Sequence, residues 1–213
     1  MRMVNPWPRS ALLASLVLVV ACGPSWRRIE PAGAGFALQM PANVDCGGTD
    51  WKHRTEDATW IGRTCAAEAE PLLSLMPAST GTYIHYSVMW AAVPSELNNA
   101  SLEDVLAAFE APEVKSRSPV IAEGQRFWET EGKEKYGHEF RNTTSSLGGQ
   151  PAIHRDAYPT GSLSVEGFVG RSRVALHQGR LYELTVAGRG GARLEAIWSR
   201  MVESFTFIEH TQG

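Results

Sequence analysis

The sequence predicts an α+β fold in which an antiparallel sheet is flanked by helices, and two features of its second half lead to this prediction. Segments with strand character follow one another there, separated by glycine-containing turns, over 134–143, 150–158, 165–176 and 180–187. A segment with the apolar spacing of a helix comes after them, beyond Gly190 and Gly191. Neighbouring strands joined by short turns favour an antiparallel meander, against which this helix packs.

The first half of the chain adds two strands and one helix. Residues 36–40 alternate apolar side chains on one face and end at Pro41, and residues 82–90 alternate over a longer stretch. Both faces of the longer segment are partly apolar, which indicates a sheet covered on both sides. Ser101 and Asp104 have the spacing of a capping box, and Pro112 limits the helix that follows to about three turns.

The last helix gives the clearest periodicity in the chain. Its apolar residues recur at helical spacing, opposite charged ones: Leu194, Ile197, Trp198, Met201, Val202 and Phe205. An apolar stripe of this kind is typical of a core face rather than of a ligand groove, so we expect it to pack on the sheet. Residues 205–207 are expected to form a short final strand.

The N-terminus has the features of an export signal. Residues 1–10 carry Arg2 and Arg9 without any acidic residue, and an apolar run over 11–21 follows. That run is about half the length needed to span a bilayer, which takes roughly 20 apolar residues. Residues 19–22 resemble the bacterial lipobox, in which small or aliphatic residues precede a cysteine. The sequence therefore predicts a lipoprotein signal peptide over 1–21.

The lipobox resemblance implies a lipid anchor and a cellular address. Cys22 would carry diacylglycerol and become the acylated N-terminus, and two or three acyl chains anchor a protein durably. Gly23, where inner-membrane retention would favour Asp, implies the outer membrane with the domain facing the periplasm. The alternative is an ordinary secretory signal, cleaved near Ala21, which leaves Cys22 as a free thiol.

A linker and a single domain are expected after the anchor. Residues 22–34 mix Gly, Pro and Ala without periodicity and are interpreted as a flexible tether, followed by one globular domain over 35–210. Trp26, Arg27 and Arg28 are interpreted as part of this plain linker. The alternative places them among anionic lipid headgroups of the membrane.

Cys46 and Cys65 form an even pair in a chain already interpreted as exported to an oxidising compartment. We therefore expect a disulfide between them, contributing about 3 kcal/mol to stability through loop closure. The alternative is a redox-active or metal-binding thiol pair. The sequence contains no Cys-x-x-Cys motif, which favours the structural interpretation.

Composition and motifs argue against several classes of function. Charged residues at 20% and hydrophobic ones at 43% are typical of a folded domain, and a net charge of −3 gives no reason to expect nucleic-acid binding. The sequence contains neither a nucleophile elbow nor a phosphate-binding loop, and it lacks a His-Glu-x-x-His motif. We expect no cofactor and no enzymatic activity.

One polar pair remains as a candidate site. His154 and Asp156 lie two residues apart on an expected strand and therefore on one face. With His85 or His177 they could form a metal site, or a base with its orienting acid. The favoured alternative is a half-exposed strand that carries ordinary polar side chains.

The order of elements resembles a PsbP-like domain, which implies an α/β/α sandwich built around an antiparallel sheet. The resemblance covers residues 35–208 and rests on segments 35–41, 149–152, 179–185 and 203–207. It implies a non-enzymatic accessory or assembly protein with a protein partner in the cell envelope, and the lipobox resemblance adds attachment to the membrane through Cys22. The alternative is a periplasmic module that binds a small molecule or a metal near His154 and Asp156, with hydrolytic activity as one extension.

Overall fold

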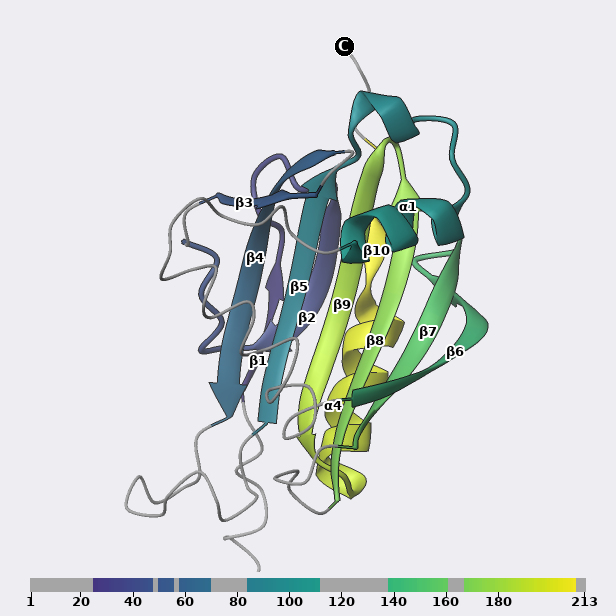
Figure 1. Ribbon diagram of the computed structural model, residues 1–213. Helices are drawn as coiled ribbons and strands as arrows, with labels where there is room; N and C mark the ends of the chain where they lie inside the picture. The colour runs from purple at the N-terminus through teal and green to yellow at the C-terminus, as the bar shows by residue number, and fades with distance from the viewer. Residues whose placement is uncertain are drawn as a thin grey trace, which may run out of the picture.

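The computed structural model describes residues 25–47, 50–55, 58–69, 84–111, 138–160 and 167–209. They form a large antiparallel sheet with a helix on each side and a small sheet beside one of the helices (Figure 1). The α+β class expected from the sequence, an antiparallel sheet flanked by helices, is confirmed. Within the described ranges, none of the helices has both the length and the apolar character that crossing a bilayer requires.

The large sheet has seven strands in the order β3-β4-β5-β9-β8-β7-β6. Their bounds are β3 (Trp51–Arg54), β4 (Thr59–Ala69), β5 (Ile84–Ala92), β6 (His138–Leu147), β7 (Gln150–Pro159), β8 (Phe168–His177) and β9 (Arg180–Arg189). The last four pair in succession as the predicted antiparallel meander. Gly148 and Gly149 join β6 to β7 with positive φ angles, which a two-residue hairpin turn requires.

The edge of the large sheet formed by β3 and β4 was not expected from the sequence. Trp51 of β3 lies across Gly62 of β4, where an added Cβ would come within 2.2 Å of the tryptophan ring. The expected disulfide is present: Cys46 and Cys65 are joined with an S–S distance of 2.10 Å. The disulfide links the segment just before β3 to the middle of β4.

The small sheet has the order β1-β2-β10, with β1 (Trp26–Ile29), β2 (Phe36–Pro41) and β10 (Thr206–Phe207). The expected strand at 36–40 and the short final strand are both present and pair antiparallel with each other. This pairing joins the two ends of the domain, because β2 opens the predicted domain and β10 closes it.

The tether expected over 22–34 is wrong for its described part. Residues 26–29 form β1, and Trp26 pairs with Pro41 at the far end of β2. Ala34 is completely buried, and its carbonyl oxygen accepts a hydrogen bond of 2.9 Å from the Tyr182 hydroxyl. Backbone pairing creates this strand without a periodic side-chain pattern, so the folded domain begins no later than Ser25.

One face of the large sheet packs against α4 (Ala192–Ser204) and the small sheet. The predicted apolar stripe of the helix is buried here: Leu194, Ile197, Trp198 and Met201. Phe36 of β2 joins the two sheets, with its ring centroid 5.3 Å from that of Trp90 and 5.9 Å from that of Tyr182. This is the larger core.

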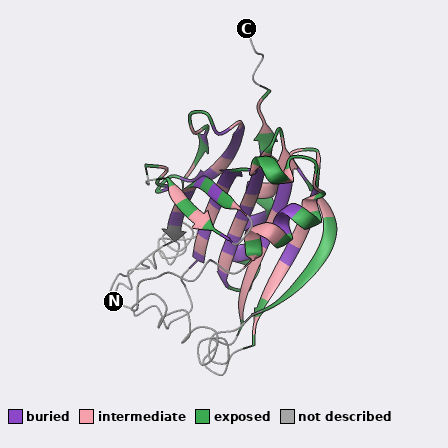
Figure 2. Cartoon of the chain, turned by 45° about the horizontal axis from the view of Figure 1, so that its top comes forward, coloured by how far each residue is buried: buried purple, intermediate pink, exposed green. Residues whose placement is uncertain are grey.

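The opposite face packs against α1 (Leu102–Glu110), which follows the short 3₁₀ turn η2 (Ser95–Leu97). Val105 and Leu106 of α1 are buried over Trp60 of β4. The predicted cap is present, because the Asp104 amide donates to the Ser101 hydroxyl at 3.1 Å. Figure 2 shows the buried residues along the central strands and exposed ones along the outer strand β6.

Candidate functional site

Strands β7 and β8 place a row of polar side chains beneath α4. His154 is directly opposite Arg173, and Asp156 is directly opposite Arg171. Ala152, on the same face of β7, belongs to the core that α4 covers. His154 and Asp156 therefore share a face, as their spacing predicts, and this face is covered by a helix.

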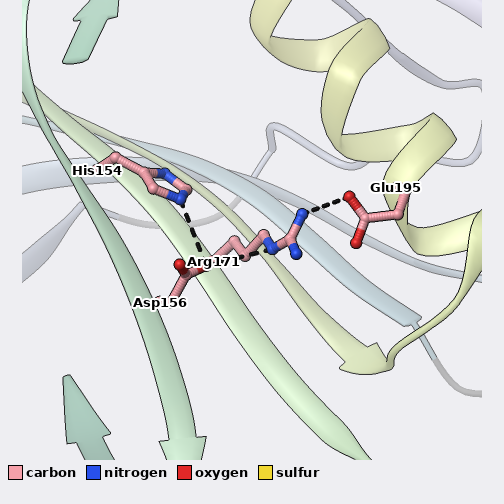
Figure 3. A network of polar contacts seen from close by, with 4 residues as sticks. All are labelled: His154, Asp156, Arg171 and Glu195. Atoms are coloured by element: carbon pink, nitrogen blue, oxygen red, sulfur yellow. Dashed lines mark hydrogen bonds and ion pairs between the residues drawn. The ribbon is translucent and has the colours of Figure 1, made fainter. Parts of the chain in front are cut away.

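These residues form a chain of charge interactions that ends on the helix (Figure 3). The His154 Nε2 atom lies 3.3 Å from Asp156 Oδ1, and the Arg171 Nε atom lies 3.3 Å from the same oxygen. Arg171 also forms an ion pair with Glu195 in the first turn of α4. The network thus ties the start of α4 to two strands of the sheet.

The third ligand that a metal site would need is not supplied by the expected residues. His85 alternates with the core residues Ile84 and Tyr86 and therefore lies on the opposite face of the sheet. His177 stacks on Phe207, with ring centroids 4.1 Å apart. In the described part of the chain, no group of three or more potential ligands gathers.

Arg171 occupies the place beside Asp156 where a cation would bind. Its guanidinium already neutralises the carboxylate, and the His154 ring packs 5.7 Å from the ring of Trp198. A metal ion would have to displace this arginine and would lie next to its positive charge. The arrangement fits an ion-pair network that fixes a helix on a sheet.

The α1 face carries a second polar cluster that sequence reasoning missed. Arg155 of β7 is buried, forms an ion pair with Glu110 at the end of α1, and lies 4.5 Å over the ring of Phe140. Glu183 of β9 hydrogen-bonds to Ser172 on the neighbouring strand. Burial, with a smaller effect of the Glu110 charge, raises the pKa of Glu183 against the opposing effects of the hydrogen bond and of the Arg155 charge.

Replacing Glu183 by glutamine tests this burial. A raised pKa means that the fold favours the neutral carboxyl, so its contribution to stability is present below the ordinary glutamate pKa and is lost as pH rises through the pKa in the folded state. Glu183→Gln is therefore expected to gain stability relative to wild type as pH rises over that interval, measured by urea unfolding across pH. A difference in stability between Glu183→Gln and wild type that stays constant with pH would contradict a raised pKa of Glu183.

A cavity of about 520 Å³ opens between the β6–β7 turn and the end of α4. Arg173 and Glu203 line it together with the ring of Phe207. His154 and Asp156 are not among its lining residues. The binding hypothesis built on those two residues predicts a pocket beside them, and the described cavity lies beyond their neighbour Arg173 instead.

The signal for these clusters was present only in part in the sequence. A spacing of two residues was enough to place His154 beside Asp156. Arg171 and Glu195 come from another strand and from the helix, and only the register of β7 with β8 and the packing of α4 bring them together. The same holds for Arg155, whose partner Glu110 lies on α1.

The fold and these clusters together define an α+β domain whose central sheet packs on its helices through apolar cores, with an ion pair linking it to each helix. No protein-family model and no curated protein sequence matches the chain. Among solved structures, the chain is similar to the cyanobacterial PsbP protein (CyanoP) of Synechocystis sp. PCC 6803, at 15% identity and a TM-score of 0.44, over 89% of this chain and 99% of that chain. It is also similar to LpqN, involved in cell envelope biogenesis of Mycobacterium tuberculosis, at 13% identity and a TM-score of 0.40, over 87% and 91%.

Proposed function

We propose that the chain is a bacterial cell-envelope lipoprotein, anchored by lipid on Cys22, whose domain acts as a non-enzymatic accessory or assembly protein. The observation that carries this proposal is the Cys46–Cys65 disulfide. Disulfides persist in oxidising compartments, which agrees with export through the apolar segment 11–21. The pairing also leaves Cys22 as the remaining one of the three cysteines, and the lipobox explains it.

The accessory role is supported by how the chain uses its polar residues. The pair best suited to acid–base chemistry, His154 and Asp156, belongs to the network that holds α4 on the sheet. Asp156 is already paired with Arg171, and neither His154 nor Asp156 lines the cavity beside the β6–β7 turn. We propose a protein partner in the envelope, and Gly23 after the cysteine supports the outer membrane with the domain in the periplasm.

Replacing Cys22 by serine tests the anchor. Cys22→Ser is expected to abolish incorporation of labelled palmitate and to leave residues 1–21 uncleaved, because the thiol that takes the diacylglyceryl group is absent and cleavage follows lipidation. Gel mobility separates processed chains from those that retain residues 1–21. Unchanged labelling, or a variant chain still processed to the wild-type mobility, would contradict the proposal.

A further inference from the structure

The distance between the lipid site and the folded domain is short. The Ala42 amide donates to the Ser25 carbonyl oxygen at 2.8 Å, and β1 begins at Trp26. Three peptide units join Cys22 to Ser25, and fully extended chain covers at most about 3.6 Å per residue, so their Cα atoms lie within about 11 Å. A domain of roughly 190 residues has a radius of gyration of about 16 Å. A lipid on Cys22 would therefore hold the start of β1 at the membrane surface.

The surface beside this point carries two arginines around one tryptophan. The Arg200 guanidinium carbon lies 4.5 Å over the ring of Trp26, and Arg200 Nε donates to Gln39 Oε1 at 2.8 Å. Gln39 is the partner of Arg28 in the β1–β2 register. Arg28 and Arg200 therefore flank the same glutamine, and both are exposed. We name Trp26, Arg28, Gln39 and Arg200 the anchor-side patch.

The two arginines of the anchor-side patch have no carboxylate partner among the described residues. Among the described residues, Arg28 and Arg200 lie in no ion pair, whereas Arg63 and Arg171 are each paired with carboxylates. The nearest acidic residues along the chain are Glu30, two residues after Arg28, and Glu203, three residues after Arg200, and the structure pairs neither of them with these arginines. An anionic surface close to Trp26 is the complement that such a patch fits.

We propose that the anchor-side patch lies against the anionic headgroups of the membrane that holds the lipid, which fixes the orientation of the domain on that membrane. The proposal rests on lipidation of Cys22. Because the anchor confines the patch to the bilayer surface, weak attraction between guanidinium groups and lipid phosphates is enough to maintain contact. Tryptophan with a polar neighbour is also typical of the interface between water and lipid. The tether expected from the sequence would have allowed every orientation.

Arginine footprinting on vesicles tests this contact. The lipidated full chain is placed in phosphatidylcholine vesicles with or without 30 mol% phosphatidylglycerol, about a third of the lipid, and its guanidinium groups are modified with phenylglyoxal and quantified by mass spectrometry. Modification of Arg28 and Arg200 is expected to slow at least about threefold on the anionic vesicles, because an attraction of about 1 kcal/mol per arginine keeps both groups in contact with the lipid headgroups. Arg54, exposed on the edge strand β3 of the large sheet, is the internal control and is expected to react equally on both.

A charge-reversal variant makes the test specific to the patch. Arg200→Glu is expected to restore fast modification of Arg28 on anionic vesicles, whereas the matched control Arg54→Glu leaves Arg28 protected. Equal modification rates of Arg28 and Arg200 on the two kinds of vesicle would overturn the proposed contact. Flotation of the same samples separates the lipid anchor from the membrane contact. A chain that floats while its arginines stay unprotected has the anchor and contradicts the contact. A chain that does not float contradicts both the anchor and the contact.

Discussion

Phe36→Ala is expected to lower the free energy of unfolding by roughly 3–5 kcal/mol, the range for an aromatic side chain deleted from a packed core. Phe36 is fully buried, and its ring stacks on Phe205 at 5.4 Å while also contacting Trp90 and Tyr182. It therefore joins the small sheet, the large sheet and the end of α4. Its loss leaves a cavity that none of these elements can fill alone.

Equilibrium unfolding in urea, followed by tryptophan fluorescence, measures this loss. Ile61→Ala is the control, since the Ile61 side chain on strand β4 is 56% exposed. The control is expected to change stability by no more than about 0.5 kcal/mol, as is usual for surface positions. A Phe36 variant as stable as the control would show that the small sheet contributes little to the core.

Removing the disulfide is the second change with a large expected effect. In the loop-entropy model, the bond that closes the segment between Cys46 and Cys65 contributes about 3 kcal/mol. The double variant Cys46→Ser/Cys65→Ser is expected to lose about that amount, measured by thermal unfolding under oxidising conditions. Adding a reductant should destabilise wild type and leave the double variant unchanged. Equal sensitivity of both proteins to reductant would contradict the assignment.

The second half of the fold could be predicted because its side chains repeat with a regular period. The strands of the meander carry glycine turns between them, and α4 shows its apolar stripe directly in the sequence. Their observed bounds differ from the predicted ones by a few residues at the ends: β6 extends to Leu147, beyond the predicted end at 143. The predicted starts at 134 and 165 lie outside the described residues.

The first part of the fold could not be predicted for two different physical reasons. β1 is held by backbone pairing with β2 and has only four residues, two of them charged, so it shows no alternation. In β4 the hydrophobicity of two neighbouring residues is opposite to their burial. Gly62 is buried under Trp51, while Ile61 is 56% exposed. A hydrophobicity pattern cannot reveal a glycine that is buried by a neighbouring ring.

The candidate sites, too, could be predicted from the sequence only in part. Spacing within one strand predicted that His154 and Asp156 would lie together, and the structure adds that Arg171 completes their network. Contacts between elements depend on strand register and helix packing, which a single sequence does not specify. The anchor-side patch is a further example, since Arg28 lies opposite Gln39 in the strand register while Arg200, far away in sequence, hydrogen-bonds to the same glutamine.

The central claim, a lipid on Cys22, is tested most directly by the mass of the N-terminal peptide of the protein isolated from membranes. Trypsin cuts after Arg27, so the peptide 22–27 would carry the anchor. We expect a peptide that begins at Cys22 and is heavier by a diacylglyceryl group on the thiol and a fatty acyl chain on the amino group. A peptide of unmodified mass that begins at Cys22, or one still joined to residues before it, would contradict the account.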